Sequence, residues 1–162
     1  MRQLDFEQLM HVFTESNNEK GAREYPHFSF QEQIRHVEQT SYTYLLNTLF
    51  ANGSGFCAVW EAEGRYVATL YVEPYMDALL LTSLETLPEA RNKGYAKKLV
   101  SAVIEYLQKQ GSYIIFSHVE KRNYASLAVH RACGFSQVLQ HAVFLDGSVS
   151  HRFLTLCRKS CT

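Results

Sequence analysis

Residues 84–96 read LETLPEARNKGYA, which is the pattern of a strand end, a proline, a basic loop and the first turn of a helix. Gly94 and Ala96 have little or no side chain, so this loop leaves the backbone N–H groups at the helix start uncovered. Such groups attract anions, and the helix dipole adds about half a positive charge. Arg91 and Lys93 add to that charge. The stretch predicts a cradle for a pyrophosphate, although a solvated basic turn before an ordinary helix has the same pattern.

The residues on either side of this loop predict a crossover between two parallel strands. Apolar side chains recur at helical spacing after the loop, at Ala96, Leu99, Val100, Val103 and Leu107. Gly111 is a natural end for that helix. Residues 78–86 before the helix and 113–119 after it are apolar runs that suit strands. A strand, a helix and a strand in this order form a crossover.

The N-terminal third predicts helices. Asp5 caps a short helix that ends before the polar residues 16–21. Ser29 and Glu32 have the form of a capping box, so a second helix begins there. Residues 42–50 have an ambiguous pattern that favours helix over strand.

Strands complete the expected fold. Antiparallel strands are expected over residues 56–61, 65–73 and 78–86, with Gly64 and Pro74 as breaks. Strands over 136–145 and 148–156 flank Asp146-Gly147, a strong hairpin signal. The fold class is therefore α/β (α+β), with a single mixed, mostly antiparallel twisted sheet and flanking helices in one domain over residues 1–162.

The composition excludes several function classes. The 162 residues include 16 basic and 16 acidic ones, so no net field attracts nucleic acid or an anionic membrane. No apolar run reaches the roughly 20 residues of a membrane span, and the acidic first turn is unlike a signal peptide. The cysteines form no C-x-x-C pair and the histidines have no ligand spacing, so no metal is expected. We expect a cytoplasmic protein without nucleic-acid or membrane partners, and the sequence leaves a homodimer open.

A second cluster of residues follows the strand over 113–119. Asn123 can cap a further short helix that ends at Gly134, a natural residue for a helix end. Ser126 and His130 lie within that helix at defined spacing from Asn123. Two matched clusters are far less frequent by chance than either one alone.

Together the two clusters resemble the GNAT superfamily of N-acetyltransferases. The pyrophosphate motif of that family reads Arg/Gln-x-x-Gly-x-Gly/Ala, which Arg91, Gly94 and Ala96 match. The family commonly has a tyrosine where this chain has His130, and otherwise the second cluster agrees. The specific match covers about residues 84–135, and the N-terminal helices match nothing specific.

The resemblance implies a GNAT-like acyl-CoA-binding fold, acetyl-CoA as cosubstrate and an amine as acceptor. The backbone of Glu85, Thr86 and Leu87 would pair with the pantetheine arm like an added strand. Asn123 and Ser126 would contact the same cofactor. The pyrophosphate would lie in the cradle formed by Arg91, Asn92, Lys93, Gly94, Tyr95 and Ala96. The N-terminal helices would help to form the acceptor pocket.

Direct transfer to an amine needs a group that takes the proton of the ammonium. Glu85 ends an apolar strand, where burial would raise its pKa, but it reads equally well as a structural carboxylate paired with Arg91 or a backbone N–H. A backbone N–H near Leu87 would hold the oxyanion if the strand splays there. His130 stands where the family places the acid that protonates the CoA thiolate, and packing within its helix is the alternative.

Other polar residues carry weaker indications. An acceptor amine could meet acidic or hydroxyl groups at a strand end, at Glu73, Tyr75 and Asp77, although sheet edges are commonly polar for solubility. Cys133 is expected to pack rather than act as a nucleophile. Gly53-x-Gly55-x-x-Ala58 fits a dinucleotide fingerprint formally, but the residues after it read as strand instead of helix.

Two other functions share part of the pattern. The first is a non-catalytic acyl-CoA-binding sensor or partner module, which the missing tyrosine supports. The second is an α/β interaction protein whose loop resembles a cradle by coincidence. Binding of acetyl-CoA would exclude the interaction protein. Turnover with amines would then distinguish an N-acetyltransferase from a non-catalytic module.

Overall fold

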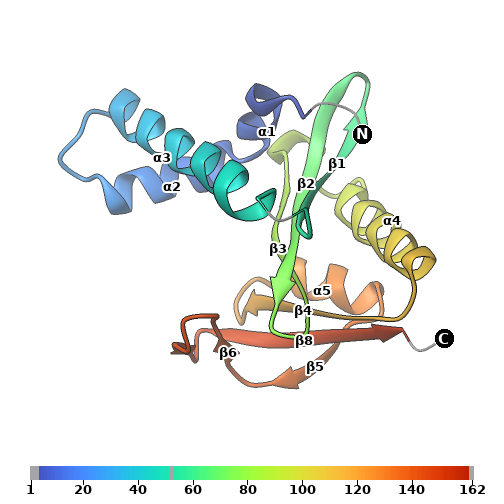
Figure 1. Cartoon of the computed structure of the whole chain (residues 1–162). Coiled ribbons are helices and arrows are strands. Elements are labelled where there is room, and N and C mark those ends of the chain that lie inside the picture. Colours follow the sequence, from blue (N-terminus) through green and yellow to red (C-terminus); the bar gives the residue numbers. More distant parts are fainter. Residues whose placement is uncertain (1–3, 52, 161–162) are drawn as a thin grey trace.

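The structure is a computed structural model that describes residues 4–51 and 53–160. Six strands form the main sheet in the order β1-β2-β3-β4-β8-β5, and β6 pairs with β7 beside it (Figure 1). These strands are β1 (Phe56–Ala62), β2 (Arg65–Tyr75), β3 (Ala78–Thr86), β4 (Tyr113–Glu120), β5 (Ser136–Leu139), β6 (Ala142–Val143), β7 (Val149–Ser150) and β8 (Phe153–Ser160). In the main sheet β3 and β4 are parallel, whereas the other neighbouring pairs are antiparallel. The expected mixed, mostly antiparallel sheet is confirmed.

Helices flank this sheet. They are α1 (Phe6–Val12), α2 (Thr14–Glu24), α3 (Phe30–Tyr44), α4 (Tyr95–Gln110) and α5 (Tyr124–Ala132), with the π-helix η1 (Leu45–Leu49) and the 3-10 helix η2 (Pro88–Ala90). Within residues 4–51 and 53–160, none of these helices has both the length and the apolar character that crossing a bilayer requires.

Strand β2 is buried on both faces and so joins two hydrophobic clusters. Side chains alternate between the faces of a strand. Ala68, Leu70 and Val72 therefore pack into the cluster that includes α4 and α5. Val67 and Tyr71 point to the opposite face, where they pack with α1 and η1. This alternation explains why β2 reads as a continuous apolar run.

The predicted crossover from β3 through α4 to β4 is confirmed. Leu79 pairs in parallel with Ile115, and α4 buries its apolar stripe against the sheet. Gly111 ends the helix with a φ of 127°, a left-handed value that favours glycine. The crossover places the start of α4 directly after the end of β3, where the cradle residues lie.

The N-terminal helices depart from the prediction in one place. Asp5 caps α1 as expected, and its side chain accepts a hydrogen bond from the Gln8 N–H. The polar residues 16–21, expected to end the helical region, are instead part of α2. Asn17 and Gly21 are buried there, and a Cβ on Gly21 would lie 3.1 Å from that of Gln33 in α3. Close packing of α2 against α3 therefore stabilises a helix that has no apolar stripe of its own.

The capping box at the start of α3 is confirmed. Ser29 and Glu32 each bind the other's backbone, as the sequence predicts. The helix then continues into η1, so the ambiguous residues 42–50 are largely helical. Leu45 and Leu49 of η1 are buried in the cluster with α1.

Strands β3 and β4 separate over their second halves. Their pairing ends at Leu81 and Ser117, where the Ser117 hydroxyl donates to the Leu81 carbonyl at 3.0 Å. Between the pairs Thr69↔Glu85 and Tyr71↔Thr82, β3 has two residues opposite one in β2. This bulge includes Ser83, whose φ is 53°. The strands thus separate well before Leu87, the residue near which a splay was considered from the resemblance to the GNAT superfamily.

The C-terminal hairpin is shorter than expected. Its turn at Asp146-Gly147 is confirmed, and the Phe144 N–H donates to the Ser148 carbonyl at 2.9 Å. However, β6 and β7 pair over two residues each. Pairing of β8 along its whole length with β4 draws that strand into the main sheet instead.

Strand β2 continues through Pro74, where the sequence predicted a break. The proline is tolerated because pairing with β1 has already ended at Val72.

Candidate active site

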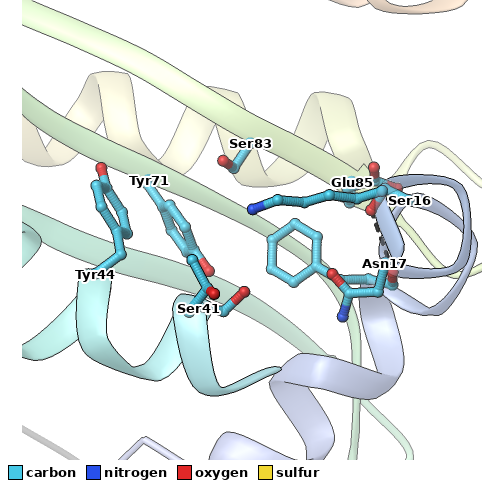
Figure 2. Close-up of a pocket in the computed structure, with 10 residues that line it drawn as sticks. Ser16, Asn17, Ser41, Tyr44, Tyr71, Ser83 and Glu85 are labelled. Carbon is cyan, nitrogen blue, oxygen red and sulfur yellow. Dashed lines mark hydrogen bonds between the residues drawn. The ribbon is translucent and has the colours of Figure 1, made fainter. Parts of the chain in front are cut away.

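A pocket of about 420 Å³ lies between the N-terminal helices and the sheet. Its lining comes from α2, α3, β2 and β3 and comprises Phe13, Ser16, Asn17, Lys20, Thr40, Ser41, Tyr44, Tyr71, Ser83 and Glu85. Figure 2 shows Glu85 and Ser16 at one end of this pocket and Tyr44 with Ser41 at the other. The bulge of β3 turns this part of the strand toward the helices. The pocket therefore begins at the end of β3 and extends along α2 and α3.

Glu85 is half-buried at the end of β3, where its backbone pairs with Thr69 of β2. Burial raises the pKa of its carboxyl group above the ordinary value of 4.5. A hydrogen bond with Ser16 and the charge of Arg91 lower that pKa, and the charges of Glu15 and Glu19 raise it. The net effect is a raised pKa, so the carboxyl group of Glu85 holds its proton more readily than an exposed one. A general base that acts near neutral pH requires such a raised pKa.

Arg91 is not the ion-pair partner of Glu85. Its Nη2 lies 2.5 Å from Oε2 of Glu15 in α2, and its Nε donates to the Thr86 carbonyl at 3.3 Å. The alternative in which Glu85 is a structural carboxylate bound directly to Arg91 is therefore not what the structure contains. Arg91 instead joins the end of β3 to helix α2.

The loop from Arg91 to Gly94 is exposed, and α4 begins at Tyr95. Gly94 occupies the N-cap position with a φ of 78°, and no side chain caps the helix there. Asn92 is also left-handed, with a φ of 61°. A Cβ on Gly94 would meet nothing within 4 Å. Glycine thus relieves backbone strain at this position and leaves open space in front of the helix.

Leu87 has hydrogen bonds that the sequence did not predict. Its N–H donates to the Val67 carbonyl at 3.0 Å, and its carbonyl accepts from the Ala90 N–H at 2.9 Å. The N–H of Leu87 is therefore occupied and does not suit an oxyanion site. Among the three residues predicted to pair with pantetheine, Glu85 and Thr86 also have backbone partners in β2, namely Thr69 and Ala68.

Asn123 and Ser126 lie at the start of α5 as predicted. The Asn123 side chain accepts a hydrogen bond from the Ser126 N–H at 3.0 Å and so caps the helix. Asn123 is exposed, and Ser126 is half-buried one turn from His130. These residues form the capped start of α5, which follows β4 in the chain.

His130 is buried, with 1% of its surface exposed. Its Nδ1 lies 2.8 Å from the Ser126 carbonyl, which accepts only, so Nδ1 carries the proton of the neutral ring. Its ring packs edge-on against Phe135 at 5.1 Å between centroids. Burial lowers the pKa of the imidazole below 6.5. Among the described atoms no partner reaches Nε2, which in the neutral ring is an acceptor.

Of three further residues that the sequence singled out, two have structural contacts. The Tyr75 hydroxyl donates to the Val143 carbonyl at 2.5 Å, so it attaches β2 to the β6–β7 hairpin. Asp77 lies in the turn after β2, away from the lining of the pocket at Glu85. Cys133 is buried and its thiol lies 3.7 Å from the Ser101 hydroxyl, so its predicted packing role is confirmed.

Sequence reasoning missed part of the site. The Tyr44 hydroxyl donates a short hydrogen bond to the carboxylate of Glu73, and burial, the largest cause, raises the pKa of Tyr44. Burial likewise raises the pKa of Tyr71. Lys20, Ser41 and Ser83 also line the pocket without having been singled out. The sequence had singled out Glu73 as a possible contact for the amine, but no local motif marks the other residues, because the fold alone brings them together.

The splayed β3–β4 pair, the glycine-bearing start of α4 and the pocket at the end of β3 together define an acyltransferase-type fold. The chain belongs to the acetyltransferase (GNAT) family, whose family model matches residues 7–135. The GNAT-like fold predicted from the sequence is confirmed.

Proteins similar to this chain carry related names. N-acetyltransferase family 8 member 3 of Mus musculus is 23% identical over 139 residues, which is 82% of this chain and 58% of that protein. The chain thus spans somewhat more than half the length of this relative. The [ribosomal protein bS18]-alanine N-acetyltransferase of Haemophilus ducreyi is 27% identical over 66% of this chain and 72% of its own. The crystal structure of PaiA N-acetyltransferase from Thermoplasma acidophilum in complex with coenzyme A superposes with a TM-score of 0.66 at 18% identity, covering 98% and 97% of the two chains.

Proposed function

We propose that this chain transfers the acetyl group of acetyl-CoA to a primary amine of a small molecule or protein by direct attack. The observation that carries the proposal is the pocket, which opens at Glu85 where β3 leaves β4, immediately before the loop that starts α4. A similar protein crystallised with coenzyme A, and relatives named N-acetyltransferases, support the same reaction.

The cofactor would be held mainly by backbone. In this proposal the strand-like backbone at Glu85 and Thr86 pairs with the pantetheine arm, and the loop before α4 holds the pyrophosphate. Arg91 would exchange its contact with Glu15 for the phosphates, and Lys93 lies exposed beside it. Asn123 and Ser126 would contact the cofactor from the start of α5. No metal is part of the proposal.

Glu85 would accept the proton of the acceptor ammonium. The neutral amine nitrogen then attacks the thioester carbon and a C–N bond forms. The C–S bond breaks to release the CoA thiolate, and the nitrogen loses its remaining extra proton to solvent water. The bulge at Ser83 lies beyond the last residue of β3 that pairs with β4. The backbone of this bulge is therefore a better candidate than the Leu87 N–H to bind the oxyanion.

His130 as the acid that protonates the thiolate remains a prediction, and the structure adds a condition to it. The ring would have to be an imidazolium, yet burial lowers its pKa below 6.5. The protonated fraction is therefore lost as pH rises through a value below 6.5, and little acid is left at neutral pH.

If His130 is that acid, the rate at saturating substrates should fall as pH rises through a value below 6.5. In His130→Tyr the fall should move to higher pH, because a phenol keeps its proton there. His130→Ala should lose rate while acetyl-CoA still binds. Wild-type rate and an unchanged profile in His130→Ala would make His130 a packing residue beside Phe135.

The function is tested by measuring thiol release from acetyl-CoA against a broad amine library. Release that depends on an added amine, with the acetylated amine found by mass spectrometry, is the expected result. Binding of acetyl-CoA without release to any amine would favour the non-catalytic acyl-CoA-binding module. We also propose that the chain forms a single domain, that it is located in the cytoplasm, and that it binds neither nucleic acid nor a membrane.

A further inference from the structure

The pocket contains one cationic and one anionic side chain. Lys20 of α2 is half-buried in the lining, and Glu85 of β3 lies at the end nearest the start of α4. The other lining residues are neutral and mostly hydroxyl-bearing or aromatic. Among the described residues, no carboxylate lies within 4.0 Å of the Lys20 ammonium. A half-buried cation without a protein counter-charge is a binding group for an anion.

The neighbouring acidic residues already have partners or lie outside the pocket. Glu15 is paired with Arg91, and Glu73 accepts the hydroxyl of Tyr44. Glu19 is exposed and affects Glu85 through its charge. The lining therefore offers one carboxylate to one ammonium group. A diamine or longer polyamine would place its second cation near Lys20 instead of near a second carboxylate.

The lining also carries hydroxyl groups. Ser41 of α3 and Ser83 of the β3 bulge both line the pocket, and their O–H groups can donate to anionic oxygens. Figure 2 shows the Ser83 and Ser41 side chains on opposite walls. A carboxylate or phosphate bound at Lys20 would thus find hydrogen-bond donors from both the sheet and the helices.

We propose that the acceptor is a small amine that also carries an anionic group, with its ammonium at Glu85 and its anion at Lys20. The inference rests on the proposed acetyl transfer and narrows its acceptor. The anionic group can be a carboxylate or a phosphate, because both can pair with the Lys20 ammonium. Matched compounds that differ only in this group distinguish the two. A peptide N-terminus or a polyamine would leave Lys20 without its counter-charge.

The test compares kcat/KM for amines that differ in one end group: 4-aminobutyrate, butylamine, 1,4-diaminobutane and the corresponding aminoalkyl phosphate. Shorter and longer members of each series allow for the length of the pocket. The anionic amines should be preferred over butylamine and the diamine. Lys20→Gln should lower kcat/KM for the preferred anionic amine by about 10–100-fold, mainly through KM, as expected for loss of one charged hydrogen bond.

Two control variants sharpen this result. Lys20→Arg retains the charge and should keep most of the preference. Lys109→Gln removes a lysine in the last turn of α4, at the opposite end of that helix from the cradle, and should have no effect. In Lys20→Gln the anionic amines should lose their preference over butylamine.

The inference is overturned if 1,4-diaminobutane or butylamine is the best acceptor, or if Lys20→Gln lowers activity with all amines equally. Absence of thiol release with every amine would defeat the proposed acetyl transfer instead. In that case ligand-observed NMR of the CoA-bound protein still tests Lys20. If 4-aminobutyrate binds the wild-type protein but not Lys20→Gln, the anion site is supported. If butylamine binds the wild-type protein as well as 4-aminobutyrate does, the anion site is refuted.

Discussion

Glu85→Gln is expected to lower the rate of acetyl transfer by about 10²–10⁴, the usual effect of removing a general base. The amide cannot take the proton of the ammonium, whereas it has nearly the same shape as the carboxyl group. Because burial raises the pKa of Glu85, the wild-type rate should also fall as pH drops through that raised value, since the base becomes protonated. The variant should lack this acidic limb.

The measurement is kcat as a function of pH, with acetyl-CoA affinity measured by calorimetry as a control. Affinity should change little, because pantetheine pairs with backbone atoms in the proposed complex. Glu19→Gln is the matched control variant, since Glu19 is an exposed carboxylate that affects Glu85 through its charge. Wild-type turnover of Glu85→Gln at every pH would assign the base role to water or to another group.

Gly94→Trp is expected to abolish the rise in melting temperature that acetyl-CoA causes in the wild-type protein. A ligand that binds the native state raises its stability by mass action, so loss of the site removes the rise. Gly94 caps α4 in open space, and an indole there would occupy the position proposed for the pyrophosphate. The left-handed φ adds backbone strain of roughly 1–2 kcal/mol, which lowers the melting temperature without the ligand.

Gly64→Trp separates these two effects. Gly64 has a similar φ of 75° and likewise meets nothing within 4 Å, but it lies in the turn between β1 and β2. It should lose a similar amount of stability and keep the full response to acetyl-CoA. If Gly94→Trp retains a full response as well, the cradle lies elsewhere.

The parts of the fold that the sequence predicted are those with local signals. Ser29 and Glu32 are three residues apart and meet within one turn of helix. The crossover around α4 follows from one apolar stripe between two apolar runs. Asn123 and Ser126 cap α5 in the same local way. In each case the residues that form the contact are near neighbours in the chain, so their pattern is visible without the fold.

The parts that the sequence did not predict depend on contacts between distant residues. Helix α2 has a polar sequence, and its packing against α3 is visible only once both helices are placed. Arg91 meets Glu15 across 76 residues, and Tyr44 meets Glu73 across 29. The bulge at Ser83 results from the register of β3 against β2. Spacing rules carry no information about such pairs, so the acceptor pocket was the least predictable region.

Helices α2 and α3 form a hairpin that extends away from the sheet (Figure 1), and this hairpin has an evolutionary consequence. It supplies Lys20 and Ser41 to the pocket, whereas the strand end and loop proposed to hold the cofactor come from residues 85–96. Substitutions within the hairpin can therefore alter which molecules are accepted while the shared cofactor segment stays the same. Diversification of acceptors among related chains would then be concentrated in one contiguous segment near the N-terminus.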